Sequence, residues 1–361
     1  MANRAGRCLV IAEAGVNHNG SLDMALKLVD AAADAGADIV KFQTFKAEAV
    51  ISRFAPKAEY QIGSTGSGES QLDMVRRLEL THEDHRHLMR HCESRNIGFL
   101  STPFDVASAR FLVEELGLGQ LKIPSGEITN AILLLAVARL ACPVILSTGM
   151  STLGEIEDAL GVLAFGYLNL GMLPSREAFR KAYVLDRGQA KLLSKVTLLH
   201  CTTEYPAPYA DVNLAAMDTL RGAFGLPVGY SDHTDGIAVS VAAAARGAAI
   251  VEKHFTLDRA LPGPDHLASL EPEALTAMVA AIRQIEEALG DGLKRPSASE
   301  LKNMPAARKS VVAARNIKTG ETFCEDNLAS KRPGTGISPM DFWQCLGRRA
   351  SRNFAEDEPI E

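Results

Sequence analysis

Short apolar runs alternate along the chain with longer amphipathic or alanine-rich stretches. The runs have the length of buried parallel strands, and the stretches between them have helical length and periodicity. Strands are predicted at residues 8–12, 38–43, 97–101, 121–124, 144–147, 196–201, 227–231 and 249–254. Helices are predicted at residues 22–35, 82–94, 106–116, 153–164 and 272–289. Eight such units predict an α/β fold, a closed (β/α)8 TIM barrel over residues 1–290.

Two insertions and a polar C-terminal part interrupt this rhythm. Residues 46–80 follow the second strand at the carboxyl edge of the barrel and include a Gly/Ser piece at 63–68, which indicates a lid. Residues 165–194 lie between a helix and the next strand, at the opposite face, and are expected to affect stability or assembly. Residues 291–307 read as a linker. Residues 308–361 predict a small β-rich domain that docks on a partner surface because its own core is thin.

Composition limits the possible partners. The chain has 47% hydrophobic and 23% charged residues, ordinary values for a globular protein, and a net charge of −6. An acidic chain is not expected to bind nucleic acid or an anionic membrane, so an anionic substrate must meet local cations. No apolar run approaches the roughly 18 residues of a membrane span, and the N-terminus does not resemble a signal peptide, which together predict a cytoplasmic protein. The six cysteines have no C-x-x-C spacing, which argues against zinc knuckles and disulfides.

Two histidines end neighbouring strands in the segment 228–255. His233 and His254 each follow a short apolar run, with alanine-rich helical sequence between them, as in a β-α-β unit. Parallel strands present their carboxyl ends at one edge, so the two imidazoles can converge on a divalent metal. The alternative is that each histidine only packs or caps its own strand end.

Cations and hydroxyls occur at the other strand ends. Lys41 and Lys122 end two strands, beside Thr102 and Ser125. Ammonium and hydroxyl groups together satisfy the many acceptor oxygens of a phosphate or carboxylate, so these residues predict an anion site.

Two glutamates leave the roles of the lysines open. Each lysine could instead pair with a nearby carboxylate such as Glu13 or Glu127. These glutamates could also act as acid/base groups or as partners of a metal-bound water.

The order of motifs resembles one enzyme family. The strings are IAEAGVNHNGS, KFQTFKA, STPFD, KIPSGEITN, ILSTGM, LLHCTTEYPAPY, GYSDHT, VEKHFTLD and PGPDHLASLEP. They are similar to those of the sialic acid synthase family, the phosphoenolpyruvate-dependent nonulosonate synthases, and they fall on successive strand ends. The tail KSVVAARNIKTGETFCEDNLASKRPGTGISPMD resembles the antifreeze-like (SAF) C-terminal domain of that family. Together they cover nearly the whole chain.

The resemblance implies roles for individual residues. It implies a divalent metal, usually manganese, with magnesium or cobalt also possible, on His233 and His254. It implies that Glu13 contacts the metal-bound water, that Glu127 is an acid/base group and that Asp265 orients the sugar. The positions implied to hold phosphoenolpyruvate are Lys41, Thr102, Lys122, Ser125, Thr203, Tyr205 and Ser231.

The resemblance also implies an assembly. Arg332, in KRPGTG, matches an arginine that reaches the active site of a partner subunit and contacts an N-acylated mannosamine-type sugar. A domain-swapped homodimer is therefore expected. The sequence leaves open any assembly beyond a dimer.

The implied reaction joins phosphoenolpyruvate, open-chain N-acetylmannosamine and water to give N-acetylneuraminate and phosphate. The alternative is a legionaminic acid synthase, which uses 2,4-diacetamido-2,4,6-trideoxymannose. A deoxy-sugar-phosphate acid synthase is disfavoured because no extra basic phosphate site is evident and because the tail domain is present. A non-catalytic sugar-binding protein is a further alternative, which the intact lysines, histidines and glutamates disfavour.

Overall fold

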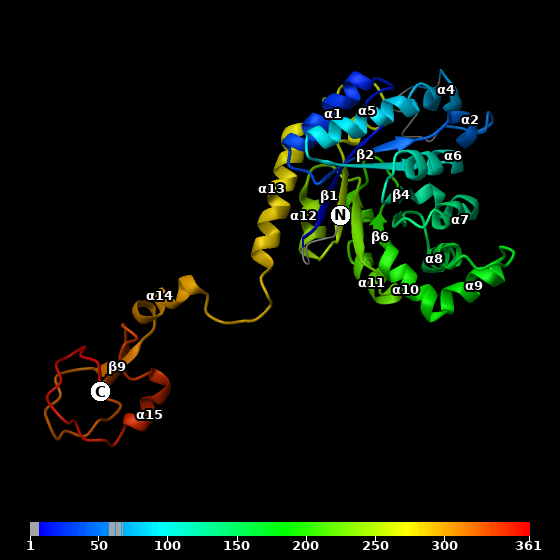
Figure 1. Cartoon of the computed structure of the whole chain (residues 1–361). Coiled ribbons are helices and arrows are strands. Elements are labelled where there is room, and N and C mark those ends of the chain that lie inside the picture. The colour runs from blue at the N-terminus through cyan, green and yellow to red at the C-terminus, as the bar shows by residue number, and fades with distance from the viewer. Residues whose placement is uncertain (1–6, 58–61, 63–65, 67) are drawn as a thin grey trace. The chain divides into compact units, whose positions relative to one another are not determined.

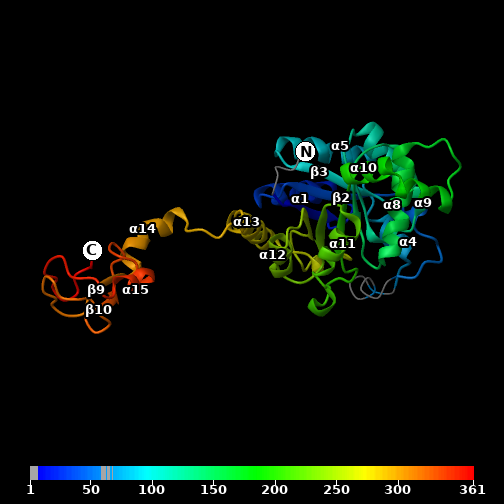
Figure 2. The same cartoon turned by 90° about the horizontal axis from the view of Figure 1, so that it is seen from below.

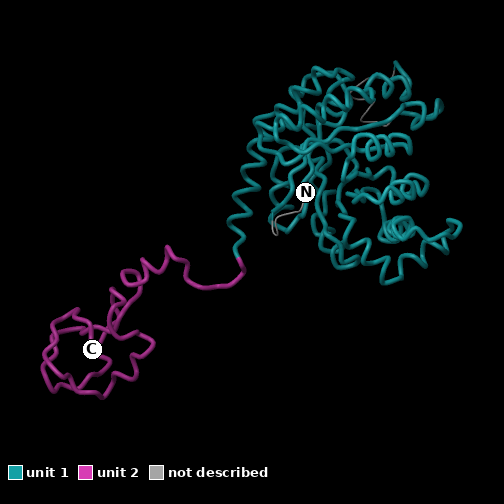
Figure 3. Tube along the Cα trace, in the orientation of Figure 1, with its two compact units in different colours: residues 1–290 teal, residues 291–361 magenta. Residues whose placement is uncertain are grey.

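The structure is a computed structural model of the chain that describes residues 7–57, 62, 66 and 68–361. The chain forms two compact units, Met1–Gly290 and Asp291–Glu361 (Figure 3). Each unit has its own hydrophobic core.

Eight parallel strands form the centre of the first unit, with helices around the outside (Figures 1 and 2). The strands are β1 (Leu9–Gly15), β2 (Ile39–Thr44), β3 (Gly98–Pro103), β4 (Leu121–Ile123), β5 (Val144–Ser147), β6 (Val196–Cys201), β7 (Val228–Asp232) and β8 (Ile250–His254). Their order is β3-β2-β1-β8-β7-β6-β5-β4, so the first strand pairs with the last. In the part of the chain that the structure describes, no ladder joins β3 to β4, although the two strands are in contact. The predicted TIM-barrel class is confirmed.

Strand alternation creates two apolar layers in the barrel. One cluster joins inward-facing side chains of several strands, with Ile11, Ile145 and Leu199 fully buried. Their neighbours in the sequence, such as Val10 on β1, belong to the main core between strands and helices. Since both faces of each strand are buried, the strands are continuous apolar runs in the sequence.

The helices of the first unit begin at side-chain caps in most cases. Thr81 and Thr152, for example, each form a capping box at the start of a helix. The outer helices are α1 (Leu22–Asp34), α5 (His82–Ser94), α6 (Val106–Arg110), α7 (Ala131–Arg139), α8 (Leu153–Leu168), α11 (Ala216–Phe224), α12 (Ala238–Ala245) and α13 (Pro272–Leu289). The helix predicted at 106–116 is α6 followed by a π-helical turn, Phe111–Glu115.

The insertion after β2 contributes short helices beside the barrel mouth. These are α2 (Ala47–Val50) and α4 (Gln71–Arg76), which contact each other. Most of the Gly/Ser piece of the predicted lid, residues 63–65 and 67, lies outside the described residues. The predicted lid therefore remains a prediction.

The second insertion is helical. It extends α8 and adds α9 (Arg176–Val184) and α10 (Asp186–Lys195). Phe165 on α8 and Phe179 on α9 meet edge to face with ring centroids 5.3 Å apart. Gly161 allows the close approach, because a Cβ there would lie 3.1 Å from the carbonyl oxygen of Phe179. The insertion thus packs on α8, while its predicted role in stability or assembly stays a prediction.

The second unit contains a small antiparallel sheet. Strands β9 (Ser310–Ala313) and β10 (Leu328–Lys331) pair, and α15 (Phe342–Cys345) follows. The predicted linker at 291–307 contains a helix, α14 (Ala298–Ala307). Among the described residues, no helix is long and apolar enough to span a membrane.

Candidate active site

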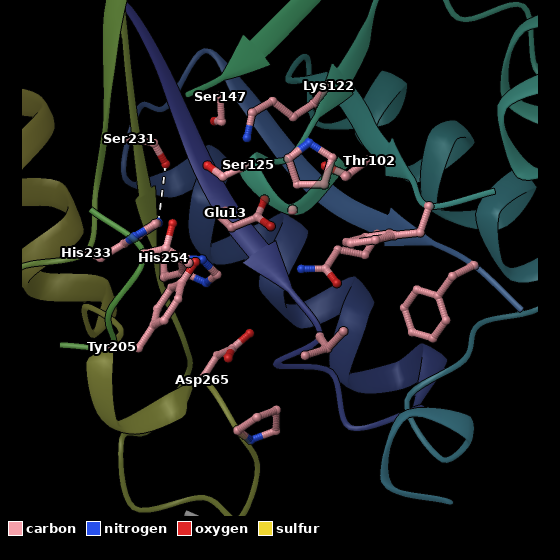
Figure 4. A pocket seen from close by; sticks show the side chains of 18 of the residues that line it. Glu13, Thr102, Lys122, Ser125, Ser147, Tyr205, Ser231, His233, His254 and Asp265 are labelled. Atoms are coloured by element: carbon pink, nitrogen blue, oxygen red, sulfur yellow. Dashed lines mark hydrogen bonds between the residues drawn. The ribbon is translucent and has the colours of Figure 1, made fainter. Parts of the chain in front are cut away.

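Most of the predicted site residues meet in one pocket at the carboxyl ends of the barrel strands (Figure 4). Its volume is about 320 Å³, a size typical of small-molecule sites. The predicted residues that line it are Glu13, Lys41, Thr102, Lys122, Ser125, Thr203, Tyr205, Ser231, His233, His254 and Asp265. They come from widely separated parts of the sequence, and barrel closure brings them together.

Two predicted site residues lie outside this lining. Glu127 follows β4 in a short 3-10 turn, where its Oε2 accepts a 2.7 Å hydrogen bond from Asn130 Nδ2. Arg332 belongs to the second unit, where its Nε donates to the carbonyl oxygen of Ala307 at 3.0 Å. The acid/base role of the first and the intersubunit role of the second stay predictions.

Two lysines and two glutamates form a buried charge network in the pocket. Lys41 Nζ lies 2.7 Å from Glu13 Oε2 and 3.5 Å from Glu252 Oε2. Lys122 Nζ lies 3.0 Å from Glu252 Oε1. The lysines are therefore paired with carboxylates, as one alternative proposed, but the partner of Lys122 is Glu252. These pairs hold two ammonium groups in one pocket, where little water screens their charge.

No sequence prediction gave a role to Glu252. Its Oε1 also accepts a 2.8 Å hydrogen bond from Ser231 Oγ. Burial would raise the pKa of Glu252, but the ammonium groups of Lys122 and Lys41 outweigh burial and hold that pKa well below its ordinary value. A signal was present in the sequence, because Glu252 lies two residues before His254 on β8 and alternate strand residues share a face.

Hydroxyl groups from further strand ends line the same pocket. Ser125 Oγ accepts a 3.0 Å hydrogen bond from the backbone N–H of Gly149 and lies 3.1 Å from Cys201 Sγ. Ser147 Oγ and Thr203 Oγ1 are buried without a hydrogen-bond partner among the described residues. Buried polar groups are normally paired, so these two hydroxyls indicate a ligand that brings its own acceptor oxygens.

The two histidines lie side by side, with ring centroids 5.7 Å apart. His233 Nδ1 lies 2.6 Å from the carbonyl oxygen of Thr202, so Nδ1 carries the proton and Nε2 keeps its lone pair. His254 Nδ1 is buried and has no hydrogen-bond partner in the described part of the chain. Burial lowers the pKa of His233 to about 4 and that of His254 well below its ordinary value. Both imidazoles are therefore neutral near neutral pH.

His233 Nε2 lies 3.4 Å from Ser231 Oγ, a long contact that a metal could replace. Neutral imidazoles are suitable ligands for a divalent metal. Within the described residues, no group of three or more His, Cys, Asp or Glu side chains could hold a metal ion. A metal on His233 and His254 would therefore need water or substrate to complete its coordination. The donor chemistry fits the predicted metal, which stays a proposal.

Two carboxyl groups of the pocket have raised pKa values. Burial raises the pKa of Glu13 to about 7, although the charge of Lys41 opposes the shift. Burial alone raises the pKa of Asp265 to about 6. Gly15 (φ +53°) lies between Glu13 and His254. A Cβ on Gly15 would be 3.3 Å from Glu13 Oε1 and 3.4 Å from His254 Cε1. A side chain at this position would separate the carboxylate from the imidazole.

At its mouth the (β/α)8 barrel carries buried lysines, neutral histidines and hydroxyls without a partner among the described residues, the arrangement of an enzyme site that suits a small anion. The chain matches the NeuB family over residues 28–294 and the SAF domain over residues 308–361. It therefore belongs to the NeuB family.

Individual relatives cover most or nearly all of the chain. The N,N'-diacetyllegionaminic acid synthase of Campylobacter jejuni is 53% identical over 354 residues, 98% of this chain and 99% of that protein. The protein of the same name from Legionella pneumophila is 45% identical over 348 residues, 96% of this chain and 92% of that protein. The crystal structure of N-acetylneuraminic acid (sialic acid) synthetase from Leptospira borgpetersenii has a TM-score of 0.66 at 36% identity, covering 82% of this chain and 90% of that chain.

These relatives confirm the predicted sialic acid synthase family and the predicted enzyme class, a synthase that forms a carbon–carbon bond. The chain is thus an enzyme and not a non-catalytic sugar-binding protein. For the sugar, the two most similar of these relatives favour the legionaminic acid alternative over the N-acetylneuraminate reading that the sequence analysis preferred.

Proposed function

We propose that the enzyme condenses phosphoenolpyruvate with open-chain 2,4-diacetamido-2,4,6-trideoxymannose to give N,N'-diacetyllegionaminic acid and phosphate. The observation that carries the reaction is the pair of buried ammonium groups, Lys41 and Lys122, beside buried hydroxyls that have no hydrogen-bond partner among the described residues. This set suits a substrate with both a phosphate and a carboxylate. The choice of sugar rests on the similarity to two synthases named for that product.

The lysines and hydroxyls bind and orient phosphoenolpyruvate in this proposal. Glu252 keeps Lys41 and Lys122 close together and charged, so the cations need no rearrangement when the anion binds. Ser125 and Thr203 line the same pocket, where their hydroxyls would donate hydrogen bonds to the oxygens of phosphoenolpyruvate. Holding the enol against the sugar aldehyde lowers the barrier through proximity.

The bond changes balance with water as the third reactant. The methylene carbon of phosphoenolpyruvate bonds to the aldehyde carbon, and water adds to the enol carbon. The carbon–oxygen bond to phosphate then breaks, and the new hydroxyl on that carbon loses its proton to become the keto oxygen. Of the two protons of water, one ends on the former aldehyde oxygen and the other on the released phosphate. Glu13, with a pKa of about 7, can accept a proton from water and return it, while Glu127 is the second candidate for this role.

His233 and His254 would hold the divalent metal, with manganese as the expected ion and magnesium or cobalt as alternatives. A metal bound there would supply Lewis-acid polarisation of the sugar aldehyde. The two imidazoles stay neutral at physiological pH because burial disfavours their protonation, so their nitrogen lone pairs remain available to a metal.

We also propose that the enzyme acts as a domain-swapped homodimer. Arg332 of one chain would contact the sugar in the pocket of the partner, as the family resemblance implies. Arg332 is exposed, so its guanidinium can meet another surface.

Phosphate release from phosphoenolpyruvate tests the proposal. With manganese present, 2,4-diacetamido-2,4,6-trideoxymannose should support faster release than N-acetylmannosamine, and no sugar should support none. Lys41→Met should abolish release, whereas Lys181→Met, an exposed lysine on α9, should not.

Other outcomes distinguish the remaining readings. Release with N-acetylmannosamine alone would assign N-acetylneuraminate as product, a candidate supported by the 36% identity to the Leptospira synthetase. Release with neither sugar would contradict the proposed reaction.

A further inference from the structure

The same pocket has an apolar wall, built from side chains of a separate hydrophobic cluster. The apolar wall consists of Val16, Phe45, Val50, Val75, Leu78 and Phe104. All six residues line the pocket that contains the lysines and histidines. An apolar surface of this kind is complementary to a ligand part that is itself apolar.

The wall is built on one side of the barrel. Val16, Phe45 and Phe104 directly follow β1, β2 and β3, which are neighbours in the sheet. Val50 and Val75 come from α2 and α4 of the insertion after β2. Of the predicted metal ligands, His254 ends β8 and His233 directly follows β7. Glu13, Lys41 and Thr102 lie within β1, β2 and β3, whereas the wall is formed by residues that come after these strands.

Side-chain packing holds the wall in place. Phe45 and Phe104 meet edge to face with ring centroids 6.0 Å apart. Phe45 and Leu78 are only 7% and 9% exposed, so the cluster is already packed without a ligand. A methyl group of a ligand would find a preformed apolar surface there.

The proposed sugar has matching chemistry. Its reacting aldehyde must lie near the lysines that hold phosphoenolpyruvate, so its distal carbons lie away from them. These carbons bear a methyl group at C6 and an acetamido methyl at C4. Resting on the proposed function, we propose that the apolar wall binds the distal methyl groups and selects 6-deoxy sugars over sugars with a C6 hydroxyl.

The charges beside the wall support this assignment. Lys46 is ion paired with Glu79 at 3.0 Å, and Arg77 is ion paired with Glu69 at 2.6 Å. A phosphate at C6 would have to compete with these carboxylates and lose water against hydrocarbon. The wall therefore disfavours a sugar phosphate as well as a C6 hydroxyl.

A series of three sugars, compared as substrates of the wild-type enzyme, tests the inference. N-acetylmannosamine differs from its 6-deoxy analogue only at C6, and 2,4-diacetamido-2,4,6-trideoxymannose adds the C4 acetamido group. The 6-deoxy sugar should have a kcat/KM about 10- to 100-fold higher than N-acetylmannosamine, the usual range for one group in an apolar pocket. The kcat/KM for the diacetamido sugar should be higher still.

Substitution of the wall should reduce this discrimination. Val75→Thr keeps the side-chain shape but adds a hydroxyl, so the 6-deoxy preference should fall by about tenfold. Val50→Thr provides a second variant on the other helix. Val184→Thr makes the same change on α9 at a residue that is 73% exposed, and it should leave the preference unchanged.

The outcomes separate this inference from the proposed function. Equal kcat/KM for N-acetylmannosamine and its 6-deoxy analogue would overturn the role of the wall and leave the synthase proposal intact. An equal loss on both sugars in Val75→Thr and in Val50→Thr would also overturn it. Absence of turnover with all three sugars would contradict the proposed function itself.

Discussion

Asp265 is a carboxyl group buried at the pocket, and no ion pair is found for it in the described part of the chain. Burial raises its pKa from 3.8 to about 6. The folded state therefore binds the proton more tightly than the unfolded state. The stability that the protonated group contributes is complete below the unfolded pKa and is lost as the pH rises through about 6.

Asp265→Asn should remove this pH-dependent loss, because an amide does not ionise. The unfolding free energy of the variant relative to wild type should increase by about 2 kcal/mol between about pH 4 and pH 8. Denaturant unfolding at both pH values measures the difference. Asp211→Asn, which removes an exposed carboxylate, controls for the change in net charge. If the increase in unfolding free energy between the two pH values were the same for Asp265→Asn and Asp211→Asn, burial of Asp265 would not affect stability.

The same substitution separates stability from function. Asp265→Asn should stabilise the fold at neutral pH but weaken use of the sugar, because Asp265 is predicted to orient it. Binding sites commonly retain groups that reduce stability. An unchanged KM for the sugar would contradict the predicted role of Asp265 in orienting it.

At the scale of elements, a buried ion pair joins β7 and β8 on the faces away from the pocket. Lys253 Nζ lies 3.1 Å from Asp232 Oδ2, and neither side chain is exposed. Asp232 also accepts hydrogen bonds from the backbone N–H of Thr234 at 2.9 Å and from Ser240 Oγ at 2.6 Å. This network fixes the loop that carries His233 and joins it to α12.

Lys253→Met should therefore affect both stability and activity. Removing one partner of a buried pair leaves an uncompensated charge, at a cost of about 3 to 5 kcal/mol in unfolding free energy. The kcat should also fall, because the loop of His233 loses its anchor. Denaturant unfolding and steady-state kinetics on the same samples measure the two effects.

A double variant distinguishes the ion pair from simple packing. Asp232→Asn combined with Lys253→Met leaves no unpaired charge, so part of the lost stability should return, which a double-mutant cycle measures. If the two single losses simply add, the pair does not couple β7 to β8 in the way the structure indicates.

Much of the fold could be predicted from local sequence. The strands Val144–Ser147 and Val196–Cys201 and the helix His82–Ser94 occupy the predicted residues, because buried strands are continuous apolar runs and helices begin at caps. Helices α9 and α10 were not recognised within the second insertion. Their apolar faces depend on packing against α8, which local periodicity does not reveal.

From the barrel fold alone, the site was predictable only where strand ends carry it, whereas Tyr205 and Asp265 lie beyond the strand ends and were predicted from the family resemblance. His233, His254 and Lys122 lie at or next to strand ends, so the barrel fold implies that they converge. Glu252 and the apolar wall depend instead on which side chains face each other across the barrel, and strand positions alone do not determine those contacts.

At the scale of the whole molecule, the pocket lies in the first unit and Arg332 in the second. The proposed swap requires each complete site to combine a barrel from one chain with a tail domain from the other. A C2 homodimer satisfies this requirement twice, since both interfaces are equivalent. The requirement can be tested by mixing chains that carry different defects.

Arg332→Ala and His233→Ala chains should complement each other when they are co-expressed. In a mixed dimer, the intact barrel of the first variant would receive the intact tail of the second. If chains pair at random, about half of the dimers are mixed, and one of the two sites in each is intact, which gives about a quarter of wild-type phosphate release. Neither variant alone should approach this rate.

A pair of barrel variants provides the control for this complementation. His233→Ala and Lys122→Met both change the same pocket, so every site of a mixed dimer keeps one defect and no activity should return. Rescue confined to the pair with Arg332→Ala would place this arginine in the site of the partner chain. Lack of rescue, with mixed dimers present by mass spectrometry, would show that Arg332 does not act across subunits, and its effect would then have to arise within one chain.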